Sequence, residues 1–228
     1  MRIAEIYRSV QGEGLLTGVP SVFVRASGCN LRCWFCDTPY TSWQPEGGDM
    51  STDEIVAQVE EWDTRHVVVT GGEPMLFAEL IPLCVRLRGI GRHVTIETAG
   101  TLYLPVECDL MSVSPKFASS APAASRHPHW HRRHERERHR PDVIRRLIGE
   151  YEYQLKFVID TQADLVEVNK YLAEFPEISR DRVLLMPQGT DQDQLDARTM
   201  WLRPYCESEG LIFCPRKQIE WFGPVRGT

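Results

Sequence analysis

Apolar residues recur along the chain in short runs rich in Val, Ile and Leu, separated by longer amphipathic stretches. The runs Val67–Val69 and Leu155–Ile159 are mostly apolar on both faces, as is typical of buried parallel strands. We therefore predict strands at Ser21–Ala26, His66–Thr70, His93–Glu97, Leu110–Ser114, Tyr153–Ile159, Arg182–Met186 and Gly210–Cys214.

Helical patterns fill most of the gaps between these strands. Ser51-Thr52-Asp53-Glu54 has the form of a capping box, and Ile55, Val56 and Val59 then recur at helical spacing. Further helices are predicted at Met75–Arg88, Pro141–Glu150, Ala163–Phe175 and Gln192–Ser208. Alternating strands and helices favour an α/β fold with mostly parallel strands, arranged as an open sheet or as a barrel.

Length and charge limit the classes of protein to which the chain can belong. A chain of 228 residues fits a single domain, spanning residues 1–228. A net charge of −6 argues against direct binding of nucleic acid by the protein as a whole. The chain has no apolar run near the ~20 residues that cross a membrane, and no signal-like start, so we expect a cytoplasmic protein without a membrane partner.

Three of the seven cysteines crowd together at C-x3-C-x2-C spacing, as Cys29, Cys33 and Cys36. In a reducing compartment such spacing indicates metal or cluster binding rather than disulfides. Three thiolates can hold three corners of an iron–sulfur cubane and leave one iron open to another ligand. The alternative is a zinc site completed by a distant Cys or His, although the remaining cysteines are scattered.

A glycine pair follows the strand predicted at His66–Thr70, in the motif Thr70-Gly71-Gly72-Glu73-Pro74. The glycines let the backbone approach a ligand closely and leave N–H and C=O groups free to bind a zwitterion. Alone, this motif could equally be a strand-to-helix turn with proline at the first helical position.

The cysteine spacing, with Phe35 as the apolar residue before Cys36, and the Gly-Gly-Glu-Pro motif together resemble the radical S-adenosylmethionine (SAM) superfamily. The resemblance implies that Cys29, Cys33 and Cys36 hold a 4Fe–4S cluster, whose open iron binds SAM and whose reduced form releases a 5′-deoxyadenosyl radical. It also implies contacts with SAM from Phe35, Gly71, Gly72, Glu73, Ser114, Pro115, Lys116, Met186, Pro187, Gln188 and Gly189.

Further segments resemble the 7-carboxy-7-deazaguanine synthases: Ile6–Gly14, Val22–Leu31, Cys36–Thr38, Ile96–Gly100, Ser112–Lys116, Trp221–Gly223 and Arg226–Thr228. The resemblance implies a lyase that converts 6-carboxy-5,6,7,8-tetrahydropterin into 7-carboxy-7-deazaguanine and ammonia in 7-deazapurine and queuosine biosynthesis, with SAM regenerated. It implies a partial, modified (β/α) barrel and a homodimer. A glycyl-radical-enzyme activase and a non-catalytic zinc or iron–sulfur module remain as alternatives.

The resemblance, together with the chemistry of a pterin, predicts the substrate contacts. The amide of Gln11 both donates and accepts, Glu13 accepts from amine groups, and Arg25 matches a carboxylate with its fork of donors. The expected contacts are Val10, Gln11, Gly12, Glu13, Arg25, Thr70, Gln218 and Pro224. The alternatives are a plain turn at Gln11–Gly14 and an ordinary ion pair at Arg25. Gln218 stands where the family often has a histidine.

Thr38 matches the residue with which the family binds Mg²⁺, the ion that orients the substrate carboxylate. A hydroxyl oxygen is a suitable hard ligand for an Mg²⁺ ion that keeps several waters. The alternative is a helix cap or a turn hydroxyl.

The segment Ser125–Arg140 is strongly basic, with six arginines, five histidines and two glutamates. It lacks an apolar stripe, so we expect a surface segment within a basic insertion at residues 117–142. It could dock an acidic electron donor such as a flavodoxin, attract nucleic acid, or bind a metal ion through its histidines. The simpler interpretation is a solvated loop that leads into the helix at Pro141.

Overall fold

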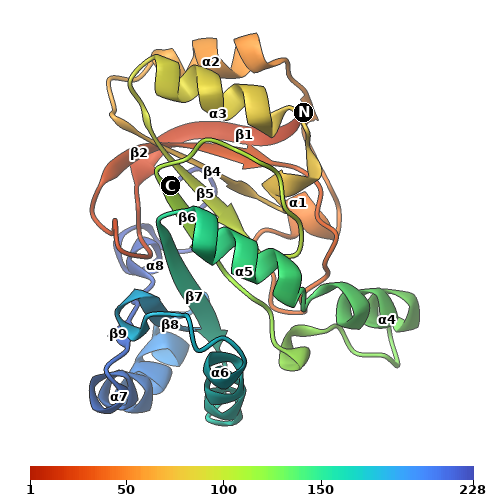
Figure 1. The fold of residues 1–228 in the computed structure, drawn as a ribbon, viewed down its shortest axis with the longest axis vertical. Coiled ribbons are helices and arrows are strands. Elements are labelled where there is room, and N and C mark those ends of the chain that lie inside the picture. The colour runs from red at the N-terminus through yellow and green to blue at the C-terminus, as the bar shows by residue number, and fades with distance from the viewer.

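A curved sheet of nine strands forms the centre of the computed structural model, which describes residues 1–228 (Figure 1). The strands are β1 (Arg2–Val10), β2 (Pro20–Ala26), β3 (Gly48–Asp49), β4 (His66–Gly71), β5 (His93–Thr98), β6 (Leu110–Val113), β7 (Tyr153–Ile159), β8 (Val183–Pro187) and β9 (Ile212–Phe213). Their order is β3-β1-β2-β4-β5-β6-β7-β8-β9. All neighbours from β2 to β9 are parallel, whereas β1 runs antiparallel to β2 and β3. The predicted α/β fold with mostly parallel strands is confirmed.

The eight helices are α1 (Pro39–Ser42), α2 (Thr52–Glu60), α3 (Leu80–Gly89), α4 (Pro128–Glu137), α5 (Pro141–Glu150), α6 (Ala163–Glu174), α7 (Gln192–Glu209) and α8 (Lys217–Phe222). Helices α2, α3, α5, α6 and α7 pack along the outer side of this sheet, whereas α1 and α8 border its inner side and α4 lies beside the cysteine loop (Figure 1). Helix α3 contacts β5, α5 contacts β6, α6 contacts β7, and α7 contacts β8 and β9. None of the helices has the length and apolar character that spanning a bilayer requires.

Strands β6 and β7 carry core residues on one face and polar residues on the other. Val113 of β6 and Phe157 of β7 belong to the main core between sheet and helices. Their neighbours Ser112 and Lys156 point to the opposite, inner face and line a cavity. The inner face of β6 and β7 is therefore partly polar, because it borders a polar site instead of a second helical layer, whereas residues Val67–Val69 of β4 are all buried, as the sequence suggested.

The predicted strands are all present, although β9 covers only Ile212–Phe213, less than the predicted Gly210–Cys214. The predicted helix Met75–Arg88 is divided into a short 3₁₀ turn, Pro74–Leu76, and α3. The division falls at Phe77, whose backbone is extended (φ −110°, ψ 115°) and cannot continue a helix. Strands β1 and β3 and helices α1 and α8 were not predicted.

The basic segment is not a loop. It forms helix α4, which begins with Pro128 at a favourable first-turn position. Its His134 is 1% exposed, so part of the segment is buried although it has no apolar stripe. The buried face packs on the cysteine loop, which follows β2.

Candidate active site

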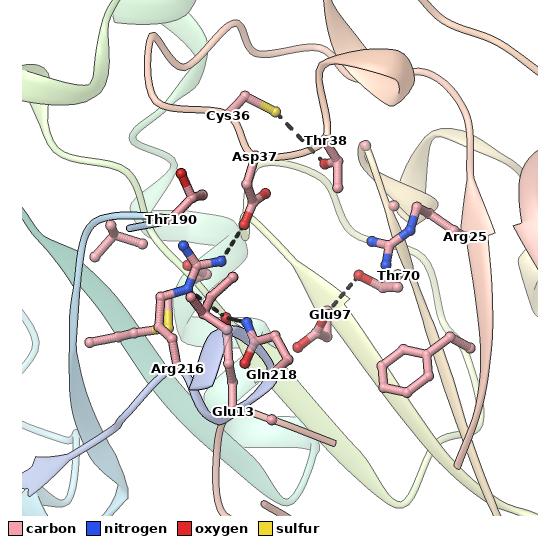
Figure 2. A pocket seen from close by; sticks show the side chains of 18 of the residues that line it. Glu13, Arg25, Cys36, Asp37, Thr38, Thr70, Glu97, Thr190, Arg216 and Gln218 are labelled. Carbon is pink, nitrogen blue, oxygen red and sulfur yellow. Dashed lines mark hydrogen bonds and ion pairs between the residues drawn. The ribbon is translucent and has the colours of Figure 1, made fainter. Parts of the chain in front are cut away.

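The inner face of the sheet carries a cavity of about 400 Å³, a size typical of small-ligand sites. Side chains from β1, β2 and β4–β8 line it, together with the cysteine loop and the C-terminal tail. Several of these residues stand at the carboxyl ends of parallel strands, where barrels of this type hold their ligands. Figure 2 shows polar side chains from distant parts of the chain pointing into this space.

The three thiols of the cysteine motif all line the cavity. The Leu31 N–H donates to Cys29 Sγ (3.4 Å), and Cys36 Sγ lies 3.2 Å from Ser42 Oγ. Burial raises the pKa of Cys29 to about 12 and that of Cys33 to about 11. These two thiols therefore carry their protons at neutral pH in the protein alone, and binding of iron would have to release them.

The donor set of the motif fits a cluster better than a single ion. No three His, Cys, Asp or Glu side chains gather closely enough to hold one metal ion. The three thiols line one cavity at separate positions instead. A cubane fits this arrangement because each thiolate takes a different iron.

The glycine pair lies beside the cysteine loop and also lines the cavity. Gly71 has φ +128°, a conformation that side chains rarely adopt, and an added Cβ would lie 2.5 Å from the Ala26 nitrogen. An added Cβ at Gly72 would lie 2.6 Å from the carbonyl carbon of Gly28. Both glycines thus allow β4 to pack against the start of the cysteine loop, in addition to exposing backbone groups to a ligand.

Glu73 does not line the cavity, although the sequence analysis expected it to contact SAM. Its side chain is fully buried and accepts hydrogen bonds from Met75 N–H (3.1 Å), Thr98 Oγ1 (2.8 Å) and Ala99 N–H (2.9 Å). Burial raises the pKa of Glu73, although these three hydrogen bonds act to lower it. The carboxyl group therefore ties the glycine turn to the end of β5 and does not reach into the cavity.

The remaining residues expected near SAM divide into two groups. Phe35, Ser114, Lys116, Met186 and Gln188 line the cavity, whereas Pro115, Pro187 and Gly189 do not. Lys116 Nζ donates to the backbone oxygen (2.6 Å) and to Oγ (2.7 Å) of Ser114, which holds this ammonium group at the cavity wall.

Glu13 is the centre of a charged network on the opposite side of the cavity (Figure 2). Its carboxylate accepts from Lys156 Nζ (2.5 Å), Arg216 Nε (3.1 Å) and Gln218 Nε2 (2.5 Å). Burial alone would raise the pKa of Glu13, but Lys156 and Arg216 outweigh burial and hold that pKa well below its usual range. Glu13 is therefore an ionised acceptor at neutral pH.

The other residues expected to bind substrate line the same cavity: Val10, Gln11, Gly12, Arg25, Thr70, Gln218 and Pro224. Arg25 Nε donates to Glu5 (2.7 Å) and its NH2 group donates to the Tyr7 hydroxyl (2.6 Å). Arg25 is thus both an ion-pair partner, as the simpler interpretation held, and part of the cavity wall. Gln11 is buried and donates from Nε2 to Ser21 Oγ (2.9 Å).

Thr38 lies at the cavity wall, two residues after Cys36. It occupies the N-cap position of α1, but its side chain makes no capping hydrogen bond. Its hydroxyl makes two long contacts, with Thr41 Oγ1 (3.4 Å) and with Cys36 Sγ (3.8 Å). The helix-cap interpretation is therefore wrong for this side chain, and the hydroxyl oxygen retains capacity for another ligand.

Sequence reasoning missed several charged residues of the site, chiefly Glu97, Lys156, Arg216 and Asp37. Glu97 accepts from Thr70 Oγ1 (2.7 Å) and from Lys156 Nζ (3.3 Å). Arg216 pairs with both Asp37 and Glu13, bridging the cysteine loop and the N-terminal turn (Figure 2). One sequence signal could have found part of this set: Lys156 interrupts the otherwise apolar run Leu155–Ile159, and a charged residue in a buried strand must have charged or polar partners.

Comparison with known proteins places this geometry in a family. The model of the Radical SAM superfamily matches residues 23–151, which include the cysteine loop and the glycine pair. A 7-carboxy-7-deazaguanine synthase of Rhodopirellula baltica is 47% identical over 227 residues, covering 99% of this chain and 88% of the relative. The chain belongs to the 7-carboxy-7-deazaguanine synthase family. A synthase of Halobacterium salinarum is 43% identical, with 95% of this chain and 88% of the relative covered.

The fold agrees with this assignment to the synthase family. The crystal structure of QueE from Escherichia coli superposes with a TM-score of 0.69 at 24% identity, covering 95% of this chain and 93% of that chain. Family membership decides against the two alternatives that the sequence left open, the activase and the non-catalytic metal module. It also implies a 4Fe–4S cluster and SAM as cofactors.

Proposed function

We propose that this chain converts 6-carboxy-5,6,7,8-tetrahydropterin into 7-carboxy-7-deazaguanine and ammonia, as a lyase of queuosine biosynthesis. The observation that carries the proposal is a single cavity, in a member of the synthase family, lined both by three cysteine thiols and by the network around Glu13. The reaction is a redox-neutral elimination, because the substrate has the atoms of the product plus ammonia. It therefore consumes no external oxidant.

We assign Cys29, Cys33 and Cys36 as the ligands of the cluster. When bound, the cluster and SAM would supply the radical chemistry for hydrogen abstraction at the carbon bearing the substrate carboxylate. Phe35 would pack near the adenine, and the backbone groups of Gly71 and Gly72 would bind the methionine part of SAM. On the same side, polar contacts would come from Ser114, Lys116 and Gln188, with Met186 as an apolar wall.

The substrate would lie between this SAM side and the network of Glu13. The ionised Glu13 carboxylate can accept from the amine groups of the pterin. Gln218 Oε1 is buried without a hydrogen-bond partner in the protein, which fits an acceptor reserved for a substrate N–H. Gln11, Thr70 and Pro224 would complete the contacts around the ring.

The substrate carboxylate needs positive charge, for which we propose Arg25 and an Mg²⁺ ion at Thr38. The Arg25 guanidinium lines the cavity and stays charged. Burial acts to lower its pKa, but the neighbouring Tyr7, Tyr40 and Glu5 outweigh burial and raise that pKa. The Thr38 hydroxyl, which makes only long contacts within the protein, would be one ligand of an ion that otherwise takes water and substrate oxygens.

The same proposal includes two protein partners. An acidic electron donor such as a flavodoxin would reduce the cluster, and a second copy of the chain would form a homodimer. The exposed arginines Arg126, Arg132 and Arg140 lie in or beside α4, next to the cysteine loop. Their positive charge supports docking of an acidic protein within reach of a cluster on that loop.

The test is a reaction with anaerobically reconstituted protein, dithionite, SAM, Mg²⁺ and 6-carboxy-5,6,7,8-tetrahydropterin, followed by mass spectrometry. We expect 7-carboxy-7-deazaguanine from the parent protein and none from Cys33→Ala. The matched control is Cys108→Ala, which removes a cysteine outside the cavity and should keep activity. If SAM is cleaved to 5′-deoxyadenosine while the pterin is left intact, the substrate assignment is wrong.

A further inference from the structure

One face of helix α4 packs on the cysteine loop, although the sequence of this helix has no apolar stripe. Trp130, His134 and Glu137 follow one another at spacings of four and three residues, which places them on one side of the helix. His127, at the N-cap of the helix, precedes Trp130 by three residues. Each of these four side chains contacts the loop or a residue that contacts it.

His134 is the buried centre of this contact, at 1% exposure. The Arg32 N–H donates to His134 Nδ1 (3.3 Å), and Nε2 lies 2.8 Å from Ser120 Oγ. The Ser120 hydroxyl donates to the Phe117 oxygen (2.6 Å), so its oxygen must accept from Nε2–H. Both ring nitrogens are thereby assigned, and the ring is neutral. Burial supports this state, because it lowers the pKa of His134 to about 4.

Arg32 stands between Cys29 and Cys33 and is held at both ends. Its backbone N–H is taken by His134, and its guanidinium lies 3.9 Å from the ring centroid of Trp130. The same guanidinium donates to the Cys29 oxygen (2.8 Å), which turns the arginine back over its own loop. Helix α4 thus fixes the residue that separates two of the three cysteines.

The other two side chains of this face extend the contact to both ends of the loop. Glu137 accepts from Asn30 Nδ2 (3.4 Å), directly after Cys29. The ring of His127 lies 4.8 Å from that of Trp43, whose Nε1–H donates to the Cys33 oxygen (3.1 Å). The loop is therefore contacted by α4 near Cys29, at its middle and near Cys33.

We propose that α4 is a brace for the cysteine loop and that His134 is its positioning residue, holding the Arg32 N–H so that Cys29 and Cys33 keep the spacing a cluster requires. The inference rests on the proposed function, in which these cysteines hold the cluster. Without an acceptor at Nδ1, the Arg32 N–H is buried and unpaired, and the loop moves to satisfy it. Groups that orient metal ligands in this way affect retention of the metal without touching it.

Two substitutions separate the two nitrogens of His134. His134→Asn puts an amide oxygen near the position of Nδ1 and keeps an acceptor for Arg32. His134→Gln puts an amide nitrogen near the position of Nε2 and keeps the donor to Ser120, but it removes the acceptor. The readouts are the rate of iron release to a chelator after anaerobic reconstitution and the midpoint potential of the cluster. We expect His134→Gln to release iron about tenfold faster than the parent, with a shifted potential, and His134→Asn within about threefold of the parent.

His129→Gln is the matched control, because His129 is exposed on the same helix and should release iron at the parental rate. Melting temperatures of the iron-free proteins show whether a variant has lost its fold. Trp130→Ala leaves the buried histidine intact, removes only the ring under Arg32, and should speed iron release by about threefold.

Equal iron release from the parent, His134→Gln and Trp130→Ala would overturn the brace. So would equally fast release from His134→Asn and His134→Gln at equal melting temperatures, because the acceptor would then be irrelevant. A parent protein that retains no iron after reconstitution would overturn the proposed function and the brace together. Failure of the brace alone leaves a parent protein that retains iron, so it can be distinguished from failure of the proposed function.

Discussion

At the scale of single residues, Gly12 is the point where the N-terminal turn and the C-terminal tail meet. The Lys217 N–H donates to the Gly12 oxygen (2.9 Å). An added Cβ at Gly12 would overlap Gln218 Oε1 and lie 2.5 Å from the Gln218 nitrogen. The sequence analysis expected Gly12 to contact the substrate, and in the structure this glycine also makes room for Gln218.

Gly12→Ala should therefore displace Gln218 from the cavity wall. We expect KM for the pterin to rise about tenfold, the equivalent of one lost hydrogen bond, with a smaller effect on kcat. Steady-state kinetics measure both constants. Gly149→Ala in α5 is the control, since a Cβ there meets nothing within 4 Å. An unchanged KM for Gly12→Ala would show that Gln218 is not a substrate contact.

Glu13 gives a prediction about stability as a function of pH. Its pKa is lower in the folded protein than in the unfolded chain, so its contribution to stability is full above the unfolded pKa of about 4.3 and is lost as pH falls through the folded pKa. Glu13→Gln leaves two buried cations with one anionic partner fewer. We expect the free energy of unfolding at pH 7 to fall by about 3 kcal/mol.

The measurement is urea unfolding of the parent and Glu13→Gln between pH 7 and pH 3. The difference between them should shrink in acid, because the parent loses its advantage as Glu13 takes up a proton. Glu60→Gln, at an exposed position of α2, should cause little change at any pH. A difference that widens below pH 4 would contradict the assigned pKa direction.

At the scale of elements, α2 is determined by its own sequence. Ser51 Oγ accepts from the Glu54 N–H (3.2 Å), and Glu54 Oε2 accepts from the Ser51 N–H (2.7 Å). Both halves of the predicted capping box are present, because the donors and acceptors lie within one turn of chain.

Ser51→Ala should lower the free energy of unfolding by about 1 kcal/mol, since the first turn of α2 loses the acceptor for an N–H group. Chemical denaturation of the iron-free protein measures this loss. Activity should not change, because Ser51 lies outside the cavity. The control is Ser125→Ala, an exposed serine that caps no helix. An equal loss in both variants would remove the capping explanation.

Helix α4 and strand β1 are elements that their own sequences did not indicate. The buried face of α4 carries His134 and half-buried Trp130, which contact a polar loop, so no apolar periodicity was needed. Strand β1 carries Glu5, Tyr7 and Arg8 within nine residues, yet it pairs along its length with β2. Tyr7 stacks on Phe23 of β2 with ring centroids 5.2 Å apart. In both cases the polar side chains of the element are paired with a neighbouring segment, the cysteine loop for α4 and strand β2 for β1.

At the scale of the whole molecule, the two ends of the chain close the cavity together. Arg226 donates to Glu5 (2.9 Å) and to Glu46 (2.8 Å), and its guanidinium lies 4.0 Å from the ring centroid of Tyr40. Residues 223–228 consequently line the cavity beside β1. The tail is held across the site by charges near the start of the chain.

Arg226→Gln should loosen the tail and raise KM for the pterin about threefold. Stability should change little, because Arg226 itself is exposed and the largely buried Glu5 keeps Arg25 and Tyr40 as partners. Steady-state kinetics at low and high salt measure this KM. High salt should raise the KM of the parent toward that of the variant, because salt screens the charges of the ion pairs. Arg203→Gln on α7 is the control, since this arginine lies outside the cavity. A parental KM in the variant would show that the tail does not need this contact.

The sequence by itself determined the features that depend on neighbouring residues. Strand β7 and helix α5 have the predicted bounds because their apolar periodicity and end signals are local. The spacing of Cys29, Cys33 and Cys36 is likewise contiguous, so the cluster motif and the family could be recognised before any fold was known.

Only the tertiary structure decided which distant residues share the site. Glu13 meets Lys156 across 143 positions and Arg216 across 203, and His134 meets Arg32 across 102. Such pairs depend on the order of strands and on the curvature of the sheet, which no local pattern encodes. The sequence therefore determined the local chemistry of the cluster loop, whereas the tertiary structure decided its partners, because only folding brings these charges and this helix together.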